Sequence, residues 1–76
     1  MYFQLTTIGD LSLLKNLVKL YLRDNSISSL INLDSAPKLT HLYIINNEIS
    51  ELETVAKLPY LEKLYGGRNR IQVYFI

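Results

Sequence analysis

The sequence predicts an α/β repeat solenoid, in which a short strand alternates with a return path of 3₁₀ or short helical turns. First, the segment LVKLYLRDNSI at residues 17–27 returns as LTHLYIINNEI at 39–49 and as LEKLYGGRNRI at 61–71, a period of 22 residues. Second, each copy begins with alternating polar and apolar residues. Third, apolar residues spaced by three follow the first two copies. A fixed period in the low twenties indicates a stack of similar structural units.

Residues 19–23 are the predicted strand of the first copy. Their period of two is typical of a strand with one buried face. Leu20 and Leu22 are expected to point inward, whereas the residues between and beside them point outward. The inward residues of the second and third strands are Leu42, Ile44 and Leu64.

Gly66 stands where the third strand should carry a second large aliphatic residue. Losing a core side chain typically costs about 2–5 kcal/mol, and glycine in a strand adds roughly 0.5–1 kcal/mol of backbone entropy. We therefore expect a weak third strand, and we expect Gly66→Leu to stabilise the fold.

An asparagine follows each predicted strand, at Asn25, Asn47 and Asn69. Asparagine side chains hydrogen-bond to nearby backbone groups and suit turns, so in a stack these three are expected to form a ladder that satisfies loop amides. The later spacing of three fits 3₁₀ or short helical turns. Pro37 and Pro59 then direct the chain into the next strand.

The chain is expected to form one leucine-containing repeat domain over residues 1–76, because its length allows a single small core. It divides into full repeats at 17–38 and 39–60 and partial repeats at 1–16 and 61–76. Repeat arrays generally need about three or more units and terminal caps. Because neither end carries a polar cap, we expect weak stability or self-association through the uncapped ends.

Composition excludes several classes of protein. The chain has no cysteine, so neither a disulfide framework nor a thiolate zinc site can form. A membrane-spanning helix needs about 18 apolar residues in a row, which the sequence lacks, and the first residues do not read as a signal peptide. The net charge of +1 gives no overall attraction to nucleic acid or membrane. We expect an intracellular protein, of the nucleus or cytoplasm, that needs no cofactor.

The segments LYLRDNSISSLINLDSAPKL and LYIINNEISELETVAKLPYL resemble the leucine-rich repeat family, in its short 22-residue subclass. Both match the pattern L-x-L-x-x-N-x-I-x-x-L-x-x-L-x-x-[LA]-P, and the leucine-rich repeat regulatory subunit of protein phosphatase 1 typifies this subclass. The resemblance implies a right-handed solenoid with a parallel strand ladder on its concave face and 3₁₀ or short helical turns on its convex face. It also implies a scaffold that binds a protein partner, such as a phosphatase catalytic subunit.

Equal spacing places matching strand residues side by side, about 4.8 Å apart. The column of Tyr21, Tyr43 and Tyr65 is the most informative, because tyrosine offers a large contact area at a small entropic cost, as in interface hot spots. The alternative is that these tyrosines only stack and cover the sheet. Three further columns complete the predicted partner-binding surface: Lys19, His41 and Lys63; Arg23, Ile45 and Gly67; and Asp24, Asn46 and Arg68.

The predicted surface is basic. Four positive charges, on Lys19, Arg23, Lys63 and Arg68, accompany one negative charge on Asp24. A basic face favours an acidic protein surface or a phosphate backbone as its partner. The alternative is that these residues are ordinary solubilising charge.

No residue pattern predicts catalysis or metal binding. Catalysis by histidine needs an acid, base or nucleophile within reach, and His41 is the single histidine, between two lysines of its column. Gly66 and Gly67 lack the G-x-x-x-x-G-K-[ST] frame of a phosphate loop. We therefore expect no enzymatic activity, no cofactor and no metal.

Three functions stay open. A regulatory or adaptor scaffold of the phosphatase-regulator type, or a fragment of one, is favoured by the resemblance. A spliceosomal-type ribonucleoprotein component would bind a protein beside RNA, so nucleic acid stays open as a less favoured partner. A degenerate repeat fragment would have no independent function and would be unfolded or aggregated when expressed alone.

Overall fold

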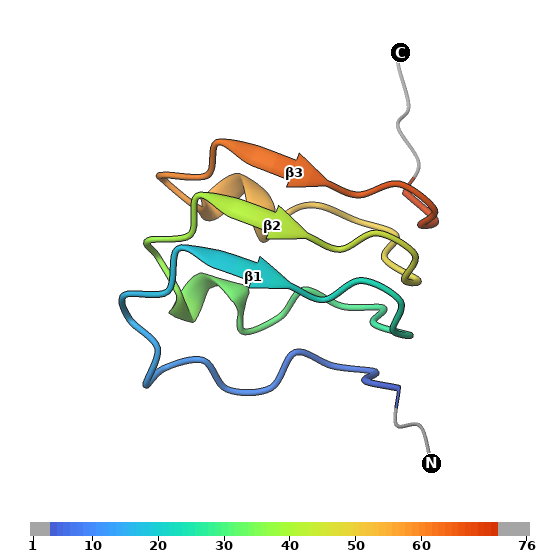
Figure 1. Ribbon diagram of the computed structural model, residues 1–76, viewed down its shortest axis with the longest axis horizontal. Coiled ribbons are helices and arrows are strands. Elements are labelled where there is room, and N and C mark those ends of the chain that lie inside the picture. Colours follow the sequence, from blue (N-terminus) through green and yellow to red (C-terminus); the bar gives the residue numbers. More distant parts are fainter. Residues whose placement is uncertain (1–3, 72–76) are drawn as a thin grey trace.

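A computed structural model describes residues 4–71, which form a three-stranded parallel sheet and two 3₁₀ turns and contain no α-helix. The strands are β1 (Lys19–Tyr21), β2 (His41–Tyr43) and β3 (Lys63–Tyr65), and the 3₁₀ turns are η1 (Leu33–Ser35) and η2 (Val55–Lys57). Figure 1 shows the strands side by side in one layer, with η1 and η2 behind them. The apolar ends of the sequence, residues 1–3 and 72–76, lie outside the described residues.

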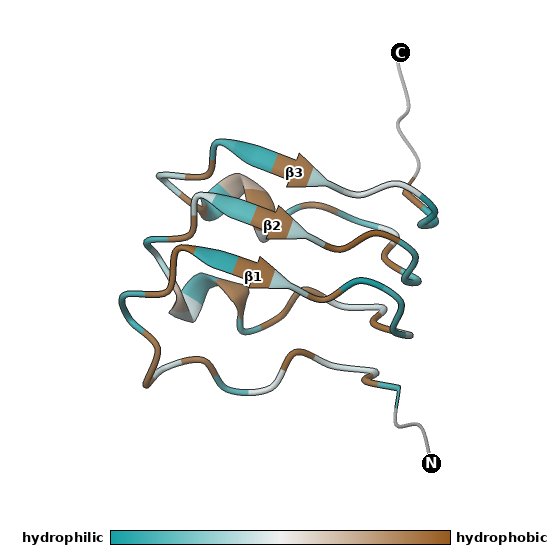
Figure 2. Ribbon diagram, viewed as in Figure 1, coloured by the Kyte–Doolittle hydropathy of each residue, from teal (hydrophilic) through white to brown (hydrophobic). Residues whose placement is uncertain are grey.

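The register of the sheet follows the 22-residue period. Leu20 pairs with Leu42, and Leu42 pairs with Leu64. The predicted parallel arrangement with matching residues side by side is therefore confirmed for the three strands. Figure 2 shows the same change along each arrow, from a hydrophilic first residue to a hydrophobic leucine to a pale tyrosine.

Each strand is shorter than the five residues that the alternation predicts. β1 ends at Tyr21, but two further hydrogen bonds continue toward the next repeat. The N–H of Leu22 donates to the carbonyl of Tyr43 at 2.8 Å, and the N–H of Asp24 donates to that of Ile45 at 3.0 Å. The regular strand stops because the backbone turns at Asp24, where φ is 61°.

The return path uses 3₁₀ geometry, as the spacing of three predicts. In the middle turn the N–H of Ala36 donates to the carbonyl of Leu33 at 3.1 Å, and that of Leu39 donates to Ala36 at 3.3 Å. The first turn contains the same pair of bonds at Leu11, Leu14 and Leu17. Residues 11–17 therefore follow the same path as residues 33–39, one period earlier.

The core lies between the strand layer and the return paths. Six large side chains have less than 2 % of their surface exposed: Ile27, Leu33, Leu39, Leu42, Ile44 and Ile49. They belong to the middle of the stack, where a neighbouring turn covers them on both sides. Two residues of the first turn are more open than the buried residues one period later: Leu5, before Ile27, is 46 % exposed, and Leu14, before Ala36, is 50 % exposed.

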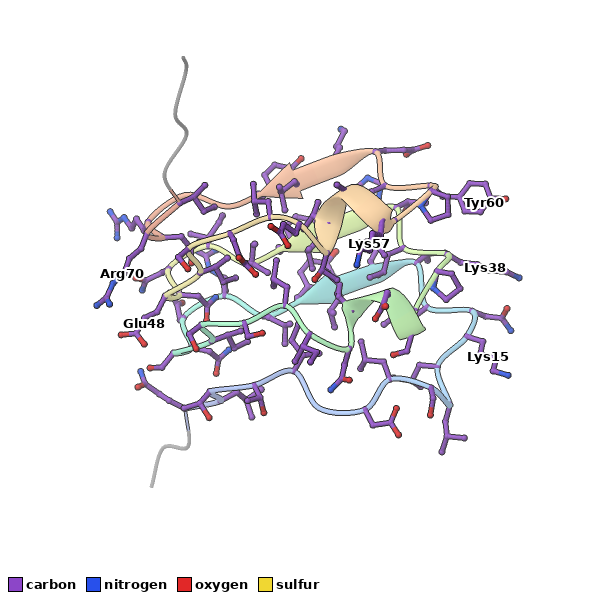
Figure 3. All side chains as sticks on the ribbon, turned by 180° about the vertical axis from the view of Figure 1, so that it is seen from behind. Lys15, Lys38, Glu48, Lys57, Tyr60 and Arg70 are labelled. Atoms are coloured by element: carbon purple, nitrogen blue, oxygen red, sulfur yellow. The ribbon has the colours of Figure 1, made fainter. Side chains whose placement is uncertain are left out.

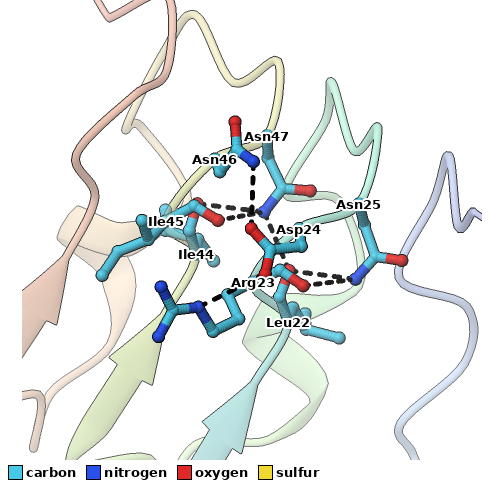
Figure 4. Close-up of polar contacts among 8 residues, drawn as sticks. All are labelled: Leu22, Arg23, Asp24, Asn25, Ile44, Ile45, Asn46 and Asn47. Atoms are coloured by element: carbon cyan, nitrogen blue, oxygen red, sulfur yellow. Dashed lines mark hydrogen bonds and ion pairs between the residues drawn. The ribbon is translucent and has the colours of Figure 1, made fainter.

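The asparagine ladder is also confirmed. The Oδ1 of Asn47 accepts the N–H of Ile27 at 3.2 Å, and its Nδ2 donates to the carbonyls of Leu22 at 2.8 Å and Ile44 at 3.0 Å. Asn25 and Asn69 make the corresponding bonds to Leu5 and Ile49. Figure 4 shows the amides of Asn25 and Asn47 reaching the strand-end carbonyls. These bonds connect successive turns where no regular strand continues.

Gly66 lies beside the core, at the place predicted for an inward residue. A Cβ atom there would lie 3.7 Å from Cδ1 of Ile71 and 3.9 Å from Cδ1 of Ile44, which is ordinary van der Waals contact. The equivalent positions hold Leu22 and Ile44, and both of these are buried. The site can therefore accept a Cβ atom without displacing the backbone.

We expect Gly66→Ala to raise the free energy of unfolding by about 0.5–1 kcal/mol through lower backbone entropy in the unfolded chain. Gly66→Leu should raise it further, because its side chain adds apolar contact with Ile44. Gly67→Ala is the matched control, since a Cβ at Gly67 has no neighbour within 4 Å. Urea unfolding measures all three variants. Gly67→Ala measures the entropic gain alone, so a Gly66→Leu variant that is no more stable than Gly67→Ala would show that residue 66 does not pack on the core.

Candidate functional site

Three tyrosine rings form a continuous stack across the sheet. The ring centroids of Tyr21 and Tyr43 are 4.3 Å apart with an interplanar angle of 8°, and those of Tyr43 and Tyr65 are 4.7 Å apart at 2°. Tyr21 is 62 % exposed and Tyr65 is 39 % exposed, whereas Tyr43 is half-buried between them. We call this stack the tyrosine ladder. The ladder presents ring edges to solvent, because neighbouring rings cover each other's inner faces.

The hydroxyl of Tyr43, the central ring of the ladder, has a raised pKa. Burial between its neighbours is the main cause that raises the pKa of Tyr43 above its ordinary value, and the nearby hydroxyl of Tyr21 raises it further. Tyrosine is neutral at physiological pH at its ordinary pKa, so the Tyr43 hydroxyl can donate a hydrogen bond as well as accept one.

The column of Lys19, His41 and Lys63 lies next to the tyrosine ladder at the start of the strands. The sheet pairs His41 with both lysines, as predicted. Nδ1 of His41 lies 2.8 Å from Oγ1 of Thr40, and its ring centroid lies 6.4 Å from that of Tyr43. His41 therefore sits half-buried within the strand surface, while both lysines are exposed.

The column of Asp24, Asn46 and Arg68 lies at the other end of the strands, where the backbone turns. All three residues adopt the left-handed conformation, with φ values of 61°, 60° and 55°. Asparagine and aspartate tolerate this conformation better than arginine does. Nδ2 of Asn46 donates to Oδ1 of Asp24 at 2.9 Å, which links two neighbouring turns.

Charge pairing shows which of the predicted positive charges on this surface stay unpaired. Nε of Arg23 lies 3.6 Å from Oδ2 of Asp24, and both side chains are mostly exposed (Figure 4). Within the described residues, no ion pair forms at Lys19, Lys63 or Arg68. The positive charges that stay available therefore lie at the start of β1 and β3 and at the turn after β3.

The structure brings all of the predicted site residues into adjacent columns on the strand layer. Ile45 completes the set: it is half-buried, and its carbonyl accepts the N–H of Asp24. The N–H of Asn46 donates to the carbonyl of Gly67 at 2.9 Å in the same way. We call this surface, from the lysine column to the turn column, the strand face.

One feature beside the strand face escaped the sequence analysis. A polar groove of about 410 Å³ runs along the turns, lined by the turn column, by the asparagine ladder and by Gln4, Ser26, Glu48 and Arg70. Two of these lining residues form an ion pair, with Nη2 of Arg70 3.5 Å from Oε1 of Glu48; both residues are labelled in Figure 3. The sequence could have indicated this groove, because Ser26, Glu48 and Arg70 are polar residues that recur at the same 22-residue step.

Within residues 4–71, no cluster of three or more histidine, aspartate or glutamate side chains is arranged to hold a metal ion. No helix among these residues has the length and hydrophobicity of a membrane-spanning segment. A scan against protein-family models and a search of curated proteins found no match to the chain.

Proposed function

We propose that the chain is a short right-handed leucine-rich repeat solenoid, with its strands on the concave face and its 3₁₀ turns on the convex face. Three features support this assignment. The strands pair in parallel at a step of 22 residues, an asparagine ladder links the turns, and each full repeat returns through a 3₁₀ turn. Stacking is the arrangement that buries both apolar faces of such a repeat.

We further propose that the protein is a non-catalytic scaffold that binds a protein partner through the strand face. The tyrosine ladder is the observation that carries this proposal. Its rings are held rigid by mutual stacking at 4.3 and 4.7 Å, so binding requires little further loss of side-chain freedom. Rigid, exposed tyrosines with available hydroxyls are typical anchors of protein interfaces.

The geometry of the tyrosine ladder favours a protein over single-stranded nucleic acid. Bases bind single-strand proteins by stacking on free aromatic faces, but the inner faces of this ladder are already covered by neighbouring rings. A protein surface can instead contact ring edges and hydroxyls. The unpaired lysines Lys19 and Lys63 beside the ladder favour a partner with an acidic surface. The leading candidate is a phosphatase catalytic subunit.

Replacing Tyr21, Tyr43 and Tyr65 with alanine should abolish capture of a purified phosphatase catalytic subunit in a pull-down. Hot-spot tyrosines typically cost about 2 kcal/mol or more each when truncated. Tyr60→Ala is the matched control, because Tyr60 is 64 % exposed and lies away from the ladder, at the edge labelled in Figure 3. Replacement of the three tyrosines with phenylalanine separates the contribution of the rings from that of the hydroxyls.

Retained capture by the triple alanine variant, with circular dichroism showing a folded chain, would refute the strand face as the site. Absence of capture by the original chain would refute the phosphatase partner. Co-purifying RNA that is lost when Lys19, Arg23, Lys63 and Arg68 become glutamate would instead support the ribonucleoprotein alternative.

A further inference from the structure

The lysine column, formed by Lys19, His41 and Lys63 across the start of the three strands, carries two unpaired positive charges. The sheet pairs His41 with Lys19 on one side and with Lys63 on the other. Among the described residues, neither lysine forms an ion pair. Aspartate and glutamate are absent from the segments that carry the columns, residues 19–23, 41–45 and 63–67. The lysine column is therefore a local site of positive potential on a chain whose net charge is only +1.

The carboxylate next to the column in sequence belongs to Glu62, which precedes Lys63. Glu62 lines a separate hollow of about 320 Å³ together with Lys38, Thr40 and Tyr60. Within the part of the chain that the structure describes, it forms no ion pair with Lys63. Both lysines of the column are therefore available to an anion from outside.

His41 is held in place at the centre of the column by contacts on two sides. Its Nδ1 lies 2.8 Å from Oγ1 of Thr40, and its ring is inclined by 17° to that of Tyr43. The hydroxyl hydrogen of Thr40 has two candidate acceptors, Nδ1 of His41 at 2.8 Å and the carbonyl of Val18 at 3.1 Å. That carbonyl already accepts the backbone N–H groups of Thr40 and His41, one for each lone pair. The network therefore assigns the hydroxyl hydrogen to Nδ1 and the ring hydrogen to Nε2.

Nε2 of His41 is open to solvent. Hydrogen bonding to the ring takes place at Nδ1, and Nε2 has no partner among the described residues. In the same part of the chain, no buried side-chain nitrogen or oxygen lacks a hydrogen-bond partner, so Nε2 must be accessible. A protonated ring would donate from the same nitrogen. The centre of the lysine column is consequently a fixed N–H donor between two ammonium groups.

These three donors suit one small anion that has several oxygens. Parallel strands lie about 4.8 Å apart, so the backbones of Lys19 and Lys63 stand roughly 10 Å apart with His41 between them. The flexible four-carbon stems of both lysines let their ammonium groups converge on an anion bound at His41. A phosphate monoester carries a charge of about −1.5 to −2 at pH 7 and three strong acceptor oxygens. It therefore matches the two ammonium charges and the three donors better than a carboxylate does.

We infer that the lysine column binds a phosphorylated side chain of a protein partner, with Lys19, His41 and Lys63 donating to the phosphate oxygens. This inference rests on the proposed function, because it assigns a chemical group of the partner to one part of the strand face. The tyrosine ladder is the next column and would contact the polypeptide beside the phosphate. A nucleic-acid strand fits less well, since its charged phosphates continue along its length whereas the tyrosine ladder is uncharged.

An NMR titration of the ¹⁵N-labelled 76-residue chain tests the inference. The probe is a capped peptide of alanines around one phosphoserine, and the same peptide with serine is its control. We expect the phosphopeptide to shift the signals of the lysine column and of the adjoining tyrosine ladder, and the serine peptide to shift neither. Inorganic phosphate should shift the lysine column alone and bind more weakly than the phosphopeptide.

Substitutions in the column separate its three donors. Lys19→Gln and Lys63→Gln should each weaken binding of the phosphopeptide about threefold, and the double variant about tenfold. His41→Phe keeps an aromatic ring beside Tyr43 but removes the donor, so it should also weaken binding about threefold. Lys57→Gln is the matched control, because it removes the same charge from η2, behind the strand layer (Figures 1 and 3), and should leave binding unchanged.

Four outcomes would overturn the inference: equal binding of the serine peptide, equal weakening by Lys57→Gln, inorganic phosphate binding as tightly as the phosphopeptide, or tighter binding of a uridine oligonucleotide. The amide spectra of the variants establish that each is folded. Phosphopeptide binding without phosphatase capture would refute the proposed partner alone. Phosphatase capture without phosphopeptide binding would refute this inference alone.

Discussion

Asn47→Ala is expected to lower the free energy of unfolding by about 2–4 kcal/mol. The side chain of Asn47 is buried and forms hydrogen bonds with the backbone of four residues, Leu22, Ile27, Ile44 and Ile45. Its removal leaves the N–H of fully buried Ile27 without an acceptor, and an unsatisfied buried group costs roughly 1–3 kcal/mol in addition to the lost bonds. In a domain of this size each kcal/mol corresponds to roughly 4–8 °C in melting temperature, so thermal unfolding monitored by circular dichroism detects the change.

The matched controls are the same substitution at the two ends of the asparagine ladder. Asn69 is half-buried, and Asn25 serves the N–H of exposed Leu5, so water can replace part of what these amides supply. We expect the loss of stability to decrease in the order Asn47, Asn69, Asn25. An equal loss at all three sites would contradict the view that burial decides the effect.

Leu42→Ala is expected to cost about 2–5 kcal/mol, because it removes a fully buried side chain from the centre of the strand layer. Natural domains of this length have a total stability of roughly 4–11 kcal/mol. The substitution should therefore remove a large share of the total stability. Urea unfolding followed by circular dichroism measures the change in free energy.

Leu20→Ala and Leu64→Ala are the controls for this prediction. They occupy the same position in the flanking strands but are only half-buried, so less apolar surface returns to water when they are truncated. A loss at either site as large as that at Leu42 would mean that the outer strands are more deeply buried than the structure indicates, as in a stable oligomer.

The register of the sheet could be predicted because several sets of repeated residues must all align in the same register. A slip of one residue would turn Leu20, Leu42 and Leu64 to the other face, and it would also separate the three asparagines that connect the turns. These requirements agree on a single step of 22 residues, and the parallel pairing follows that step. The position of Gly66 beside Ile44 and Ile71 follows from the same periodicity.

The pairing of individual polar side chains could not be predicted from periodicity. The repeat places Asp24 beside Asn46, but it does not say that Asp24 also pairs with Arg23. The pair forms between adjacent residues at the turn, where the backbone of Asp24 is left-handed. Composition gives the net charge of the strand face, but not which of its positive charges is paired.

The accessibility of the tyrosines also had to come from the structure. The sequence places Tyr21, Tyr43 and Tyr65 in one column, but it leaves open whether their ring faces or their edges are available. The ring spacing shows that neighbouring faces are covered. This result agrees with both sequence interpretations, because stacked tyrosines can cover the sheet and still present their edges to a partner.

The tyrosine ladder is the basis of the proposed binding face, so the contacts of its central ring give the most direct test. Nuclear Overhauser measurements on the 76-residue chain, with assigned ring protons, report which rings are neighbours. We expect cross-peaks from the Tyr43 ring to both Tyr21 and Tyr65. If Tyr43 shows contact with only one of them, or with neither, the three strands do not share the register described here and the proposed face does not exist.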